Sequence, residues 1–297
     1  MHKLSILLIG LLFANYSFAQ TETLSQEEQY YQFLVDSIEN SFQYEYGEVS
    51  IIENVATITV PSGFKYLNAE QSYYVMTDLW ENPPSETLGL LFPIDNSPLS
   101  DYFTYAVEIS YSEDGYIKDE DAADLDYNDL LEEMQDDASD ANTERIDLGY
   151  ESIELVGWAS DPFYDATNKK LHWAKELKFG ESESHTLNYN IRILGRKGYL
   201  NLNAIGMMNI LPLVNEDINK IIGCVEFDEG NTYFDFNPDM DDIASYGIGG
   251  LIAGKILAKV GFFAVLLKFW KLIAIAAVGL FSAFRKKIFG SKEEPID

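Results

Sequence analysis

Cysteine and positive charge are both scarce in this sequence. One cysteine stands among 297 residues, which excludes a disulfide framework within the chain. Lysine and arginine total 20 against 49 aspartates and glutamates, giving a formal net charge of −29. This excess of negative charge argues against nucleic acid as a partner, because binding to phosphate backbones depends on basic residues.

Common catalytic and cofactor-binding motifs are also missing. The sequence contains no G-x-S-x-G, H-E-x-x-H, P-loop or G-x-G-x-x-G pattern. Past the first 19 residues the only histidines are His172 and His185, whose spacing does not indicate a metal centre. Cys224 falls on the apolar side of a predicted helix, which is typical of core packing. We therefore expect no catalytic residue, no cofactor and no metal ion, and we favour a non-enzymatic protein.

One acidic stretch is similar to the start of a calcium-binding loop. Oxygen ligands alternate from Asp235 to Asp242. However, Met240 stands where an EF-hand needs glycine, and Tyr246 stands where it needs a bidentate glutamate. We interpret the stretch as a solvated acidic turn.

The two ends of the chain indicate export and membrane attachment. Residues 1–19 have a basic start, an apolar stretch and small residues before the expected cut, which is typical of a secretory signal peptide. Residues 261–284 are mostly apolar, and 24 helical residues would reach about 36 Å, enough for a hydrocarbon core of about 30 Å. Arg285, Lys286 and Lys287 follow directly, so the positive-inside rule places the tail 285–297 in the cytoplasm.

Charge divides the chain between these ends. Residues 20–242 hold 11 of the 20 basic and 46 of the 49 acidic residues, a net charge of −35, whereas the last 55 residues are basic and apolar. We expect 20–242 to be an acidic extracytoplasmic domain. Residues 243–260 carry a small-residue stripe of Gly250, Gly254 and Ala258. This glycine-rich juxtamembrane segment suits a helix on the bilayer surface, a packing helix in an oligomer or a lysine-lined pore.

The patterning of the domain predicts an α+β fold. An antiparallel β-sheet meander with packed helices is expected, because four consecutive alternating segments are joined by short polar turns. Helical spacing of apolar residues marks two packing helices. The four predicted strands are Ser152–Trp158, Leu171–Phe179, Thr186–Leu194 and Gly198–Met207, and the two helices are Asp121–Gln135 and Asn215–Cys224.

The candidate ligand-binding residues are arginines and their polar neighbours. Arginine is rare in the acidic domain, and Asn188, Asn190 and Arg192 share one face of a predicted strand, from which they could bind a carboxylate or phosphate. An alternative is that the arginines pair with nearby acids and organise the sheet. Aromatic residues upstream could line a groove or simply pack. The candidate set is Trp158, Tyr164, Asp165, Asn188, Arg192 and Arg196.

Three stretches resemble a bacterial family of membrane-anchored proteins known as domain of unknown function 2167. They are GWASDPFYDATNKKLHWA from Gly157, LNYNIRILGRKG from Leu187, and Gly230–Phe236 leading to Tyr246-Gly247 and the glycine-rich segment. The resemblance covers most of residues 50–285. It implies a signal, a C-terminal anchor and no assigned activity.

These observations together predict a single-pass protein of the bacterial inner membrane with a periplasmic main domain. Its expected role is a binding or accessory module whose tail meets the membrane, further copies of itself or a membrane-protein partner. The alternative is an enzyme or a small-ligand receptor with a cleft around Trp158, Tyr164, Arg192 and Arg196.

Overall fold

A computed structural model describes residues 26–254, except 81, 83, 101–102 and 148. The chain divides into two units, Met1–Asn40 and Ser41–Asp297. In the first unit the described part is essentially helix α1, Gln26–Glu39. Every other element belongs to the second unit.

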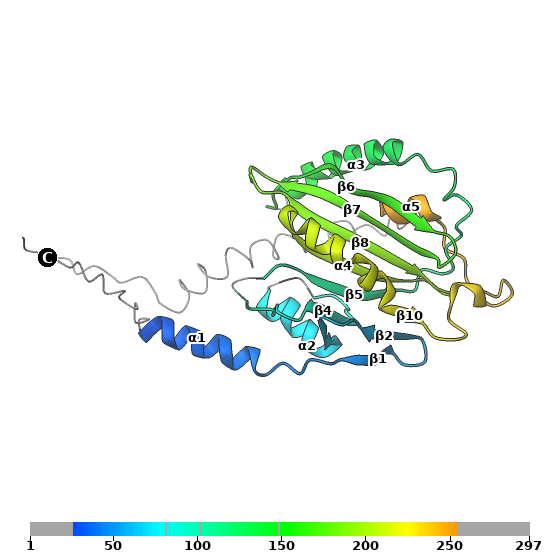
Figure 1. Ribbon diagram of the computed structural model, residues 1–297. Helices are drawn as coiled ribbons and strands as arrows, with labels where there is room; N and C mark the ends of the chain where they lie inside the picture. Colours follow the sequence, from blue (N-terminus) through cyan, green and yellow to red (C-terminus); the bar gives the residue numbers. More distant parts are fainter. Residues whose placement is uncertain (1–25, 81, 83, 101–102, 148, 255–297) are drawn as a thin grey trace, which may run out of the picture. The chain divides into compact units, whose positions relative to one another are not determined.

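A large antiparallel sheet, seven-stranded over the described residues, forms the middle layer of the second unit (Figure 1). The strand order is β3-β4-β5-β9-β8-β7-β6, so two meanders, β3 to β5 and β6 to β9, join where β5 pairs with β9. Within each meander neighbouring strands are consecutive in sequence and antiparallel. Short turns connect β6 to β9, whereas the segment between β3 and β4 contains helical turns. The strands are β3 Phe64–Asn68, β4 Gly89–Pro93, β5 Ala106–Ser112, β6 Ile153–Asp165, β7 Lys170–Phe179, β8 Thr186–Leu194 and β9 Tyr199–Met207.

One face of this sheet is covered by helix α4 and a small second sheet. Helix α4, Leu211–Gly223, follows the 3₁₀ turn η2, Met208–Ile210, and buries its apolar side against the strands. The second sheet has the order β1-β2-β10 and packs into the same core. Its strands are β1 Gly47–Ile52, β2 Ala56–Val60 and β10 Val225–Phe227.

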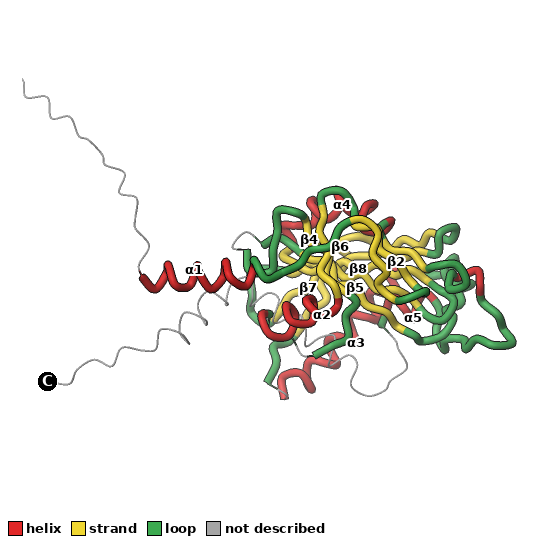
Figure 2. Tube along the Cα trace, turned by 90° about the horizontal axis from the view of Figure 1, so that it is seen from below, coloured by secondary structure: helices red, strands yellow, loops and turns green. Residues whose placement is uncertain are grey.

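The opposite face of the large sheet carries helices α2, α3 and α5, so the strands of the second unit lie between helical layers (Figure 2). Helix α3 and the short helix α5 pack over β6 and β7 in one apolar cluster that includes Trp173. Helix α2 and the π-helical turn η1 pack over β3 and β4 in another cluster that includes Trp80. These elements are α2 Ala69–Tyr74, η1 Val75–Leu79, α3 Tyr127–Asp147, the 3₁₀ turn η3 Tyr233–Asp235 and α5 Ile248–Ala253.

The predicted α+β class with an antiparallel meander is confirmed, since the four predicted strands correspond to β6, β7, β8 and β9. The helix expected at Asp121–Gln135 instead begins at Tyr127 and ends at Asp147. Its start is fixed by Asp126, whose Oδ1 accepts from the backbone N–H groups of Asn128 at 2.9 Å and Asp129 at 3.3 Å. Alternation also predicts strands at Val55–Val60, Leu88–Phe92 and Tyr102–Tyr111, which correspond to β2, β4 and β5, whereas β3 and β10 were not expected.

The membrane-related expectations fall mostly on undescribed residues. The signal 1–19, the span 261–284 and the tail 285–297 lie outside the described residues. In the part of the chain that the structure describes, no helix has the length and apolar character to cross a bilayer.

Part of the expected juxtamembrane segment 243–260 is described, and it is folded onto the domain. Helix α5 ends at Ala253 and is capped by Gly254, which adopts φ +71°; the helix buries Ile248 and Leu251 in the cluster beneath α3. A Cβ on Gly250 would lie 2.7 Å from the Cβ of Tyr246, so this glycine permits close packing inside the domain.

Candidate functional site

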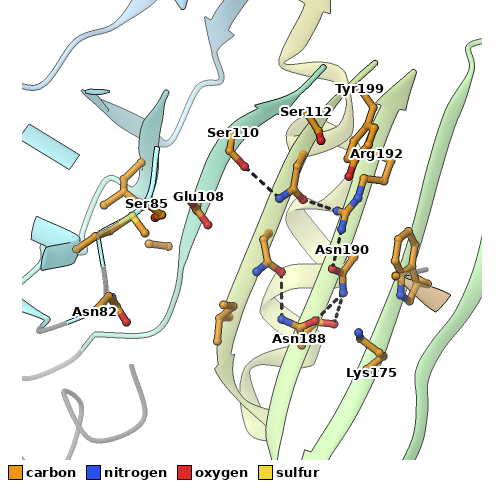
Figure 3. A pocket seen from close by; sticks show the side chains of 18 of the residues that line it. Asn82, Ser85, Glu108, Ser110, Ser112, Lys175, Asn188, Asn190, Arg192 and Tyr199 are labelled. Carbon is orange, nitrogen blue, oxygen red and sulfur yellow. Dashed lines mark hydrogen bonds between the residues drawn. The ribbon is translucent and has the colours of Figure 1, made fainter. Parts of the chain in front are cut away.

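A cavity of about 360 Å³ opens on the face of the large sheet between the two helical clusters (Figure 3). Strands β5, β9, β8 and β7 supply its floor. Met76 and Trp80 from the η1 side form one wall, and Leu251 and Ile252 of α5 form another. The volume falls within the range of small-molecule sites, about 300 to 1,000 Å³.

Strand alternation makes the floor polar. On β8 the odd-numbered residues enter the core beneath α4, so Asn188, Asn190 and Arg192 point to the cavity side. The pairing register continues this polarity across the sheet: Glu108 on β5 faces Asn203 on β9, which faces Asn190 on β8. Apolar residues would be expected at the centre of a sheet that is covered on both faces.

The asparagines of the floor are held by hydrogen bonds to one another. Asn190 Nδ2 donates to Asn188 Oδ1 at 2.7 Å, and Asn188 Nδ2 donates to Asn203 Oδ1 at 3.1 Å. In the next row Asn201 Nδ2 donates to Ser110 Oγ at 3.1 Å. These bonds connect β5, β9 and β8 through side chains, so the polar floor is preorganised.

Arg192 is fixed in place without a carboxylate. Its Nη1 donates to the Ile191 carbonyl at 3.1 Å and also to Asn201 Oδ1, and its Nη2 lies 3.4 Å from Asn190 Oδ1. The guanidinium lies 5.1 Å from the ring centre of Trp173, a cation–π distance. Burial lowers the pKa of the Arg192 guanidinium, because desolvation disfavours its charged form.

Two further ionisable groups flank Arg192 in the cavity. Among the described residues, neither Glu108, Lys175 nor Arg192 has an ion-pair partner. Burial raises the pKa of the Glu108 carboxyl to about 7, although the Arg192 charge works against the rise. Burial, together with the nearby Arg192 charge, lowers the pKa of the Lys175 ammonium to about 8. Perturbed groups that converge in a cavity are a recognised mark of functional sites.

Several polar atoms around the cavity lack partners in the described part of the chain. Asn82 is 4% exposed, lines the cavity, and makes no hydrogen bond to a described residue through either amide atom. Trp173 Nε1 and Arg192 Nε are also buried and make no hydrogen bond to a described residue. Buried polar groups normally have partners, so this concentration of unmet donors and acceptors marks the cavity.

The structure brings only two of the six candidate residues together. Asn188 and Arg192 line the cavity. Trp158 on β6 is packed beside α3, and its Nε1 donates to the Tyr127 carbonyl at 3.1 Å. Arg196, in the turn after β8, pairs with Asp241 at 2.7 Å, as the structural alternative anticipated.

Tyr164 and Asp165 lie at the end of the edge strand β6, away from the cavity lining. The Tyr164 hydroxyl donates to Asp119 at 2.6 Å, and Asp165 Oδ1 accepts from the backbone of Thr167 at 2.9 Å. The expected single cleft around Trp158, Tyr164, Arg192 and Arg196 is therefore not formed.

The sequence reasoning missed Glu108, Lys175, Asn201 and Asn203. A usable signal was present, because the predicted strands that contain them alternate polar and apolar residues. What alternation could not show is that the polar face of each strand meets a cavity rather than solvent.

The acidic turn from Asp235 to Asp242 is used within the chain. Asp235 Oδ2 accepts from the backbone of Thr232 at 2.9 Å, and Asp241 pairs with Arg196 and accepts from the backbone of Asn237. Over the described residues, no group of three or more histidine, cysteine, aspartate or glutamate side chains is arranged to hold a metal ion.

The chain matches one family model by sequence and is similar in structure to a solved protein. The family model described as Protein of unknown function (DUF2167) matches residues 43–282. No curated protein matches the sequence. The solution structure of cyanobacterial PsbP (CyanoP) from Synechocystis sp. PCC 6803 is similar at 9% identity and a TM-score of 0.33, over 63% of this chain and 92% of that chain.

Proposed function

This chain belongs to the DUF2167 family, and we propose that it is a membrane-anchored, extracytoplasmic binding module whose ligand site is the sheet-face cavity. The observation that carries the proposal is the trio of Glu108, Lys175 and Arg192. These three charges share one cavity without an ion pair to any described residue.

Unpaired charges inside a cavity are unexpected, because removal from water penalises a charge that has no partner. Acids are plentiful in the domain, and three of its other cations, Lys169, Arg196 and Lys220, each pair with a carboxylate, at 2.6, 2.7 and 2.7 Å. Taking a charge out of water without a partner costs free energy that a ligand of complementary charge can recover. The proposed site is therefore one in which the binding energy comes from charges that the fold leaves without an ion pair.

The anchoring part of the proposal rests on sequence. We propose a signal peptide at 1–19, an extracytoplasmic domain at 20–242, a glycine-rich segment at 243–260, a single span at 261–284 and a cytoplasmic tail at 285–297. In a bacterium this orientation puts the cavity in the periplasm. The span would also be the place where further copies or a membrane-protein partner associate.

A protease experiment tests the orientation. Protease is added to intact spheroplasts that express the protein with an epitope after Asp297, and lysed spheroplasts serve as the control. We expect the domain to be digested while a short epitope-bearing fragment survives in intact spheroplasts. Survival of the whole chain until lysis would overturn the proposed location.

A ligand-induced melting shift tests the binding role. The full chain, purified in mild detergent, is heated with separate panels of carboxylates, phosphates, amino acids, short peptides and sugars. At least one panel should raise the melting temperature of the wild type and not that of Lys175→Met. The matched control is Lys118→Met, an exposed lysine outside the cavity, which should respond like the wild type. If no panel acts, or if Lys175→Met responds fully, the cavity is not the binding site.

The alternative of an enzyme or receptor built around Trp158, Tyr164, Arg192 and Arg196 is not carried further, because these residues lie apart. Binding of a small ligand remains part of the proposal, because Arg192 lines the cavity.

A further inference from the structure

We infer that the cavity binds a short zwitterionic peptide, of two or three residues with free ends, whose carboxylate meets Arg192 and Lys175 and whose ammonium meets Glu108. The inference rests on the proposed function and specifies its ligand class. It follows from how charge, amide groups and apolar walls are placed around one cavity.

The first step is the separation of opposite charges. Glu108 projects from β5 at one side of the cavity, whereas Lys175 and Arg192 project from β7 and β8 at the other (Figure 3). An anion alone would leave the Glu108 carboxylate unpaired, and a cation alone would leave both basic groups unpaired. A ligand with opposite charges at its two ends gives each of the three an oppositely charged partner, with one carboxylate shared by the two cations.

The second step is length. The strand order β5-β9-β8-β7 puts Glu108 and Lys175 three strands apart, and the register sets Lys175 two residues beyond the row of Glu108. Their Cα atoms are therefore about 16 Å apart, at about 4.8 Å per strand and about 3.4 Å per residue. The two side chains cover part of this span. Two or three extended residues, at about 3.4 Å each, suit the remainder. A single α-amino acid is too short to reach both ends.

The third step is the amide-rich floor between the charges. Asn188 and Asn190 lie between Glu108 and Lys175 (Figure 3), and their bonds to each other and to Asn203 fix their orientation. Asn82, on the Glu108 side, offers a buried amide N–H₂ and C=O that no described residue uses. A peptide group needs one donor and one acceptor, which a side-chain amide supplies together.

The fourth step is the apolar wall. Met76, Trp80 and Leu90 line one side of the cavity, and Leu251 and Ile252 line the other. A sugar or a simple dicarboxylate would place its polar groups against these apolar walls. Peptide side chains of apolar character would bury them, and the burial contributes about 25 cal/mol per Å².

Affinity selection with mass spectrometry tests the inference. The full chain in mild detergent is incubated with pooled dipeptides and tripeptides in three forms: free ends, acetylated amine and amidated carboxyl. We expect capture of the free form, and a loss of about tenfold or more when either end is blocked, because each blocked end removes a charge-assisted contact.

Variants assign the two ends. Glu108→Gln should weaken binding of the free peptides and abolish the preference over the acetylated form. Lys175→Met should weaken binding of the free peptides and reduce their preference over the amidated form, because Arg192 alone then meets the carboxylate. The exposed Glu226→Gln and Lys118→Met serve as controls and should keep both preferences. Circular dichroism verifies that each variant is folded.

The outcomes separate the two proposals. If ligands bind in the cavity but blocked peptides bind as well as free ones, or if single-ended anions bind best, the zwitterion inference is overturned and the binding module stands. If no ligand of any panel binds in a manner sensitive to Lys175→Met, both proposals fall.

Discussion

Replacing Glu108 by glutamine should stabilise the unliganded protein, and increasingly so as the pH rises. Burial raises the pKa of this carboxyl from its ordinary value of 4.5 to about 7. Between these two pH values the folded protein holds a proton that the unfolded chain has released. The free energy of unfolding of the wild type therefore falls with pH across this window. Glutamine carries no ionisable proton, so the variant lacks this contribution.

The magnitude follows from the two pKa values. The difference between 4.5 and about 7 corresponds to about 3 kcal/mol at about 1.4 kcal/mol per pH unit. Glu108 is only half-buried, and solvent at the cavity mouth screens its charge, so we expect about 2 kcal/mol. The variant should match the wild type near pH 4.5 and exceed its stability by this amount at pH 8.

Urea unfolding followed by tryptophan fluorescence measures the difference from pH 4.5 to pH 8.5. The other titratable groups lining the cavity are Lys175, Arg192, Glu86 and tyrosines, and they are present in both proteins. Glu226→Gln, an exposed carboxyl, is the control and should show no such trend. A stability difference for Glu108→Gln that does not change with pH would refute the reasoning.

Three further predictions concern the scaffold. Asp119→Asn should lower the free energy of unfolding, measured in urea, by about 2 kcal/mol. Asp119 accepts from Lys169 at 2.6 Å, and the substitution leaves that lysine, 14% exposed, without a counter-charge. An unchanged urea midpoint would contradict this. Gly198→Ala should lower the free energy of unfolding by about 3 kcal/mol, because the added Cβ would lie 1.9 Å from the Ser112 carbonyl oxygen. A melting temperature equal to that of the wild type would refute the clash. Cys224 is 4% exposed and burial raises its pKa to about 12, so a maleimide should label it only after unfolding; rapid labelling of the native protein would show the thiol to be accessible.

Local pattern was enough to predict the second meander. The predicted strand Thr186–Leu194 has the same ends as β8, because apolar residues at every second position fill one core while polar residues mark the other face. The α3 start was misplaced because a run of aspartates hides which one caps the helix, and Asp126 does so. Strands β3 and β10 are short and lack a clear alternation.

The candidate site was only half predictable. Asn188 and Arg192 were found because they share one strand, where spacing alone puts them on one face. Glu108 joins them through the pairing of β5 with β9 and of β9 with β8, which no local pattern reveals. Trp158 and Arg196 were conspicuous by residue type, but their contacts serve packing and an ion pair.

The seam between the two meanders has a consequence for biogenesis. Ser112 pairs with Tyr199, so β5 waits for a partner that is synthesised 87 positions later. During synthesis the chain must keep this unpaired edge of β5 soluble until β9 is available. Shortened products that stop before Tyr199 should consequently need a holding chaperone, and the dense negative charge of the early segments would help to keep neighbouring nascent chains apart.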